Sequence, residues 1–333
     1  MAMEPTHTLT VRNEADLLAL VPFTLGFVPE DSLVIVTFGR DGRPFHARVD
    51  LPDDVLTLES VAAELVGAAV HNGAEVALVV VYTVDECLAD MADELLAPYL
   101  VAGGIRILTS IRADGSRWYP LDTGTEDPCR LQGVPYDITT HPLTSQSVLE
   151  GRVLYASRDE MQESLSVADP DLVDAVDDAV EALPDLGSVR SVLLTEGQWA
   201  MRCTDRLLRG GVEVVTSCPA EELARLLRAL AHRDIRDLVW NEIDRATAPA
   251  YVVLWRELVR RSPEQVVAAP AGLLAFSAWL AGNGALAWCA IDRALEADPD
   301  HKLAQLVAEA LERAMPPSRW RPMDPTALTL FAG

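Results

Sequence analysis

The chain has 333 residues, half of them hydrophobic, so it is long enough for two folded domains and apolar enough to bury their cores. Its formal net charge of −24 opposes binding to a polyanion, and we expect no nucleic-acid partner. The N-terminal segment lacks the basic region of a secretory signal, and no stretch approaches the roughly 18 apolar residues of a membrane span. We therefore expect a cytoplasmic protein without a membrane partner.

Residues 8–140 are predicted to form an α/β domain. A β-branched run at 33–38, an Asp-Gly turn and an alternating segment at 45–51 indicate a β-hairpin. Two helical patterns then alternate with apolar strands, and a second hairpin ends near residue 121. The resulting order, β-β-α-β-α-β-β, predicts a mixed β-sheet with helices.

Residues 122–142 are rich in Gly, Pro, Asp and Thr and show no periodicity, which predicts a long loop. Such a loop either forms part of a functional site or is an ordered connector between domains. Cys129 lies in it beside Arg130, which could activate the thiol, but no histidine base is identifiable and an inert thiol is the alternative. The five cysteines are scattered and never form a C-x-x-C pair, so we expect free thiols and no metal site.

Residues 141–316 are predicted to form a helical domain, followed by a C-terminal tail at 317–333. The candidate helices are 144–155, 158–165, 169–183, 188–209, 219–230, 232–245, 249–262, 268–282, 285–297 and 301–315. A short strand at 212–215 is a further expectation.

The most specific pattern in the helical domain is a 34-residue unit counted from Ala268. Leu274, Ala287 and Pro299 match packing and helix-ending positions of a tetratricopeptide (TPR) repeat, although Ala271 stands where that repeat has tryptophan. The spacing predicts a TPR-like helical hairpin at 268–300.

The sequence carries no known catalytic signature. It has no H-E-x-x-H, P-loop, G-x-S-x-G or G-x-G-x-x-G motif, and its six histidines lie far apart in the sequence. We therefore lean away from an enzyme and expect no cofactor and no metal.

Three polar clusters are candidate ligand-binding features. Asp31 and Ser32 either bind a ligand or form the turn that leads into the first strand. Arg48 and Asp50 project from one face of a strand, where they could bind an anion or form an ion pair. The segment 112–130 places arginines beside aromatic residues, including Arg117 and Trp118, which indicates either a pocket for an acidic or planar ligand or a structural tryptophan with paired arginines.

Several segments in this order resemble one family. They are "ADLLALVPFTLGFVPEDSLVIV", "ARVDLP", "SRWYPL", "DPCRLQGVP", "RDLVWNEI" and "APAGLLAFSAWLAGNGALAWCAIDRALEADPDHKLAQLV". Together they resemble the actinobacterial domain-of-unknown-function family 4192 over nearly the whole chain. Members usually carry a Cys-Cys-Pro motif after the Arg-Trp pair, whereas this sequence has only Cys129. The positions that carry the resemblance are Gly26, Pro29, Ser32, Arg48, Asp50, Arg117, Trp118, Gly133 and Pro135.

Two hypotheses about function follow. The first is a protein-protein interaction or scaffold module, whose helical domain offers a surface to a protein partner or to a second copy of the chain. The second is an enzyme or small-molecule sensor that binds a polar or anionic ligand where Arg48, Asp50, Arg117 and Trp118 meet the turn at Asp31 and Ser32.

Overall fold

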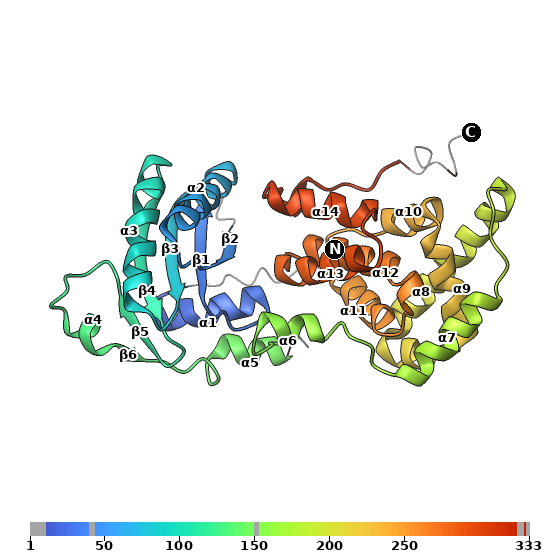
Figure 1. Cartoon of the computed structure of the whole chain (residues 1–333), viewed down its shortest axis with the longest axis horizontal. Coiled ribbons are helices and arrows are strands. Elements are labelled where there is room, and N and C mark those ends of the chain that lie inside the picture. The colour runs from blue at the N-terminus through green and yellow to red at the C-terminus, as the bar shows by residue number, and fades with distance from the viewer. Residues whose placement is uncertain (1–10, 40–43, 150–152, 325–329, 331–333) are drawn as a thin grey trace, which may run out of the picture. The chain divides into compact units, whose positions relative to one another are not determined.

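The computed structural model describes residues 11–39, 44–149, 153–324 and 330. Its contacts divide the chain into two compact units, the first ending at Arg158 and the second beginning at Asp159 (Figure 1). The division lies beyond the expected boundary at residue 140, because the helix after the long loop packs against the first helix of the α/β unit.

The first unit contains a mixed sheet with helices, as predicted. Its elements are α1 (Glu14–Leu25), β1 (Ser32–Gly39), β2 (Pro44–Asp50), α2 (Val55–His71), β3 (Ala74–Tyr82), α3 (Glu86–Ala102), β4 (Arg106–Ala113), β5 (Arg117–Pro120), α4 (Pro128–Gln132), β6 (Val134–Pro135) and α5 (Pro142–Leu149). Among the described residues the strand order is β2-β1-β3-β4-β5-β6, and β3 and β4 are the parallel neighbours. The predicted hairpin of β1 and β2 is confirmed, while its turn lies outside the described residues.

Both faces of this sheet are covered. On one face, Leu33 and Val79 pack with Leu58 of α2 and Leu96 of α3. On the other face, alternate residues of the same strands pack against α1. Strands buried on both sides need apolar residues at every position, which explains the continuous apolar runs of β1 and β3.

Three elements of the first unit are not predicted from the sequence. Helix α1 begins at Asn13, whose side chain accepts the Asp16 N–H, and it ends at Gly26 with φ 82°. It is buried almost all round from Leu17 and contains Pro22, so it shows neither an amphipathic period nor a proline-free run. The expected long loop contains the other two, α4 and β6, which are too short for a periodic signal.

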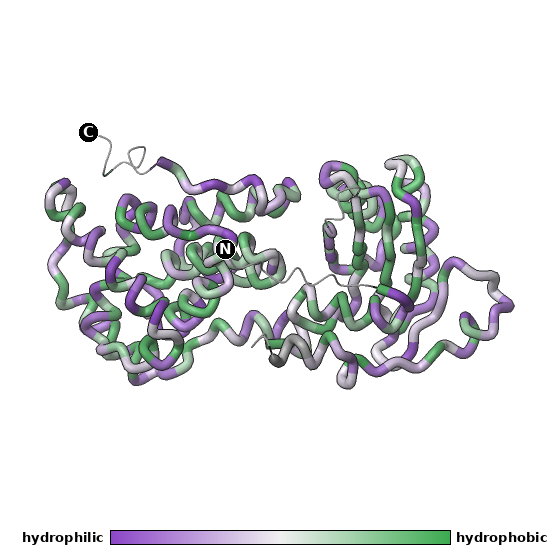
Figure 2. The backbone as a smooth tube through the Cα atoms, turned by 180° about the vertical axis from the view of Figure 1, so that it is seen from behind, coloured by the Kyte–Doolittle hydropathy of each residue, from purple (hydrophilic) through white to green (hydrophobic). Residues whose placement is uncertain are grey.

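The second unit is helical. Its elements are α6 (Arg158–Glu163), α7 (Pro170–Ala182), α8 (Arg190–Thr216), α9 (Ala220–Ala231), α10 (Arg233–Asn241), α11 (Ala248–Val259), α12 (Ala268–Leu280), α13 (Gly284–Ala297) and α14 (Lys302–Glu312), with 3-10 turns η1 (Glu264–Val266) and η2 (Pro317–Arg319). Apolar and polar residues alternate along these helices, as Figure 2 shows. The strand expected at 212–215 is wrong, because α8 breaks at Gly211 (φ 66°) and then continues as helix to Thr216.

The predicted helical hairpin corresponds to α12 and α13, with α14 packed against both. Their contact is lined by small side chains, which allow a close approach of the backbones. The fully buried alanines are Ala271, Ala275, Ala278, Ala287, Ala290 and Ala294. The TPR-like character of the pair stays a prediction.

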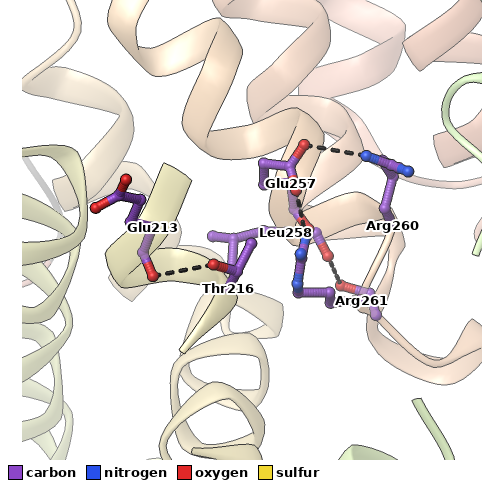
Figure 3. A network of polar contacts seen from close by, with 7 residues as sticks. Glu213, Thr216, Glu257, Leu258, Arg260 and Arg261 are labelled. Atoms are coloured by element: carbon purple, nitrogen blue, oxygen red, sulfur yellow. Dashed lines mark hydrogen bonds and ion pairs between the residues drawn. The ribbon is translucent and has the colours of Figure 1, made fainter. Parts of the chain in front are cut away.

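A buried ion network lies at the end of α11. The Glu257 carboxylate lies between the guanidinium groups of Arg260 and Arg261 (Figure 3), and its side chain is 7% exposed. Burial raises the pKa of Glu257, but the two arginines outweigh it and lower the pKa below the ordinary value. The charge is thus compensated inside the unit.

None of the helices in the described part of the chain combines the length and the apolar character that crossing a membrane requires.

Candidate functional site

The turn that leads into β1 holds together three of the predicted site residues. Ser32 is fully buried, and its hydroxyl donates to the carbonyl of Glu30 at 2.5 Å and accepts from Nε of Arg48 at 2.9 Å. Arg48 Nη2 also pairs with Asp50 Oδ1 at 2.6 Å. These contacts join edge strand β2 to the start of β1, and they satisfy the Ser32 hydroxyl completely.

Asp31 contributes to the same turn through its backbone, not through its side chain. Its φ of 38° is left-handed, a conformation that aspartate tolerates better than most residues. Its carbonyl accepts the N–H of Leu51 at 2.8 Å, and its side chain is exposed. The turn is therefore a connection between β1 and the end of β2.

Arg117 and Trp118 lie on β5, and strands β1, β3 and β4 separate them from Arg48 on β2. Four strand spacings correspond to about 19 Å. Arg48 pairs with Val34, which packs in the core on the α1 side of the sheet, and Trp118 packs in the same core. Successive residues of a strand point to opposite faces, so Arg117 points away from the face that carries Arg48. The six predicted residues therefore do not form one site.

Arg117 and Arg130 instead fold the segment after β5. Arg117 Nη1 donates to the carbonyls of Gln132 and Gly133, both at 2.9 Å, at the end of α4. Arg130 donates to the carbonyl of Leu121 at 2.9 Å and pairs with Asp90 of α3 at 2.6 Å. The segment predicted as a loop is therefore ordered, and it lies beside α3.

Gly133 lets the segment after β5 approach that strand closely. Its φ is 65°, and a Cβ atom there would lie 2.6 Å from the ring of Tyr119. No side chain fits at that distance.

Arg112, at the end of β4, is the one buried guanidinium of this region that lacks a carboxylate. It is 6% exposed and lies over the ring of Tyr119, with 3.8 Å between its Cζ atom and the ring centroid. Nη1 is 3.4 Å from the carbonyl oxygens of both Thr83 and Val84, beyond the usual range of about 2.7–3.2 Å. Nε is buried without a hydrogen-bond partner, and within the described residues no acidic group pairs with this arginine.

The carboxylate nearest in sequence, Asp114, is occupied elsewhere. It accepts hydrogen bonds from the N–H groups of Ser116 and Arg117 and from the Tyr119 hydroxyl, at 2.9, 2.7 and 2.9 Å. Burial opposes ionisation, but these hydrogen bonds prevail and lower the pKa of Asp114 to about 2. Asp114 therefore holds the β4–β5 turn and leaves the charge of Arg112 uncompensated.

A second polar pair lies on the same face of β4. Ser110 precedes Arg112 by two residues, and its hydroxyl donates to Oδ1 of Asp93 on α3 at 2.5 Å. Burial raises the pKa of Asp93, and the neighbouring carboxylates Asp122 and Asp90 act in the same direction, against hydrogen bonding by Ser110 and the charge of Arg130. Perturbed acids of this kind concentrate at functional sites.

These groups, together with Tyr119, form the candidate site, which we name the β4–α3 site: Asp90, Asp93, Ser110, Arg112, Tyr119 and Arg130. It offers a cation, a carboxyl group and a hydroxyl group between β4, α3 and the segment after β5. Sequence reasoning included Arg112, Tyr119 and Arg130 in its arginine-aromatic segment but missed Asp90, Asp93 and Ser110. Those three lie on two elements whose patterns show only packing.

In the ranges that the structure describes, no group of three or more His, Cys, Asp or Glu side chains is arranged to hold a metal ion. No disulfide joins any of the five cysteines, all of which the structure describes, and the exposed Cys129 lies in the first turn of α4.

The fold defines a class of two-unit protein in which a mixed α/β unit precedes a helical unit. The chain belongs to the family described as Domain of unknown function (DUF4192), whose model matches residues 15–318. The resemblance seen in the ordered motifs is thereby confirmed. Comparison with curated proteins and with solved structures found no match.

Proposed function

We propose that the α/β unit binds a small anionic ligand, bearing a carboxylate or phosphate group, at the β4–α3 site. The observation that carries this proposal is Arg112, a buried guanidinium whose Nε has no partner. Removing a charge from water without a counter-charge is strongly unfavourable, so a site of this kind is completed by an anion.

The surroundings of Arg112 favour a small ligand over a polymer. The net charge of −24 repels extended polyanions, whereas one buried guanidinium acts at short range where water is excluded. Asp93 and Ser110 add a hydrogen-bonding pair on the same face of the strand. The ligand class is therefore a small acid that also carries a hydrogen-bonding group.

Thermal unfolding with a panel of anions tests this proposal. Inorganic phosphate, acetate, citrate and nucleoside monophosphates are added to the wild type and to Arg112→Met. A binding anion at about 100 times its Kd stabilises the folded state by about 2.7 kcal/mol, and we expect this shift in the wild type only.

Arg106→Met is the matched control, because Arg106 is an exposed cation at the other end of β4. It should keep the ligand response. If no anion shifts the wild type, or if Arg112→Met responds like the wild type, the proposal is wrong.

A protein-interaction module is the second candidate, with the helical unit as the binding surface. The specific observation is that this unit holds the segment 316–324, which is a 3-10 turn followed by irregular chain, through aromatic and backbone contacts. A labelled peptide of that sequence, titrated onto full-length Trp320→Ala, should bind with a saturable rise in fluorescence anisotropy. A flat titration would reject this candidate.

A further inference from the structure

The segment after α14 inserts an aromatic anchor into the helical unit. Trp320 packs against Trp240 of α10 and Phe276 of α12, with ring centroids 4.9 and 5.0 Å apart. Its indole N–H donates to the carbonyl of Ile243 at 3.0 Å. Trp240 and Phe276 also contact each other edge-on at 5.5 Å, so the three rings form one cluster.

We name the surface of α10 and α12 that receives Trp320 the groove, and it also recognises the backbone of the segment. The Asn241 side chain accepts the N–H of Met323 at 2.7 Å and donates to its carbonyl at 3.0 Å. Arg190 then holds the carbonyl of Leu330 at 3.1 Å, and the Leu330 side chain is 4% exposed. Backbone recognition joined to aromatic and aliphatic anchors is how proteins bind extended peptides.

The connection between α14 and this segment is strained. Ala314 has φ 48°, a left-handed conformation that a residue with a Cβ atom rarely adopts. Pro316 and Pro317 follow after Met315, and a proline disfavours helical backbone in the residue before it. Straightening the hinge at Ala314 would release the strain and carry the segment away from its own groove.

We propose that the groove exchanges this segment between two copies of the chain, so that Trp320, Met323 and Leu330 of one copy occupy the groove of the other. This inference rests on the second candidate function, protein binding by the helical unit. A second copy is the favoured occupant because it carries the complete set of anchors, and because strain at a short hinge favours domain exchange.

Light scattering across a concentration series of the full chain tests the proposal. We expect a monomer of 36.2 kDa at low concentration and a dimer of twice that mass at high concentration. Ala314→Gly relieves the strain of the closed hinge and should weaken dimerisation by about fivefold for each tail. Ala314→Pro forbids the positive φ and should strengthen dimerisation.

Two tail variants serve as controls. Trp320→Ala removes the anchor, and Met323→Pro removes the N–H that Asn241 accepts and restricts the backbone around it. Both should abolish the dimer while the helical circular dichroism signal of the wild type is kept, and a lost signal would mark a folding defect instead. A wild type and Ala314→Pro that both stay monomeric overturn the exchange. The peptide titration with Trp320→Ala then separates the two failures, because peptide binding without dimerisation rejects the second copy as occupant and leaves the interaction module standing.

Discussion

Acidification should destabilise the helical unit through His301. This side chain is 6% exposed, and its Nε2 lies 3.1 Å from Nη1 of Arg236. Its Nδ1 lies 3.4 Å from the N–H of Ala304 at the start of α14. Arg236 and the Ala304 N–H are both donors, so both contacts require an accepting ring nitrogen, and a protonated imidazole has none. Gly272 closes the site, because a Cβ atom there would lie 2.3 Å from the imidazole.

The magnitude follows from the pKa of His301. Burial, and then the Arg236 cation, lowers it from 6.5 to about 4, against a weaker opposing effect of Asp298. The unfolded chain therefore binds a proton below pH 6.5, whereas the folded chain does so only near pH 4. The contribution of His301 to the free energy of unfolding is intact above pH 6.5 and decreases as the pH falls toward 4, by about 3 kcal/mol in total.

His301→Asn is the matched variant, since asparagine caps a helix well and does not titrate. We expect urea unfolding, followed by circular dichroism from pH 7 to pH 4.5, to show a steeper loss of stability in the wild type. His46, whose pKa burial lowers to about 4, is present in both proteins and cancels from the difference. Parallel pH profiles of the two proteins would refute the reasoning.

Three further predictions concern stability at neutral pH, measured as the free energy of unfolding in urea. Glu257→Gln removes the buried charge that pairs with the buried Arg261 and the partly exposed Arg260, and it should lower the free energy of unfolding by about 3 kcal/mol, so an unchanged value would contradict a buried network. Gly133→Ala should lower it by about 2 kcal/mol through φ 65° and the clash with Tyr119, and Gly115→Ala, which has φ 93° but open space around it, should lower it by less. Arg112→Met should raise the stability of the ligand-free protein by about 1 kcal/mol, because an uncompensated buried charge disappears, and a decrease would make Arg112 a structural residue.

The regular elements of both units could largely be predicted from the sequence, because their signals are local. The apolar run of β3 and the Asn-Gly ending of α2 each depend on neighbouring residues. Helix α1 could not be predicted, because a helix buried on all sides has no polar face to mark its period. The strand expected at 212–215 failed for a related reason, since a run of four residues is compatible with either conformation.

For the candidate site, too, the sequence predicted only what depends on neighbouring residues. Spacing placed Arg48 and Asp50 on one face of a strand, and the structure pairs them. Sequence could not say how many strands separate them from Trp118, because strand order is set by long-range pairing. It also could not distinguish paired from unpaired arginines.

The sequence by itself determined the mixed sheet, the helical second half and the family, because periodicity, turn residues and motif order can be observed directly in the amino-acid sequence. Only the tertiary structure decided that Arg117 and Arg130 hold the segment after β5 in place beside α3, while Arg112 keeps an uncompensated charge. It also decided that Trp320 fills a groove built from α10 and α12. The physical reason is that compensation and burial depend on partners far away in sequence, which only the packed chain brings within reach.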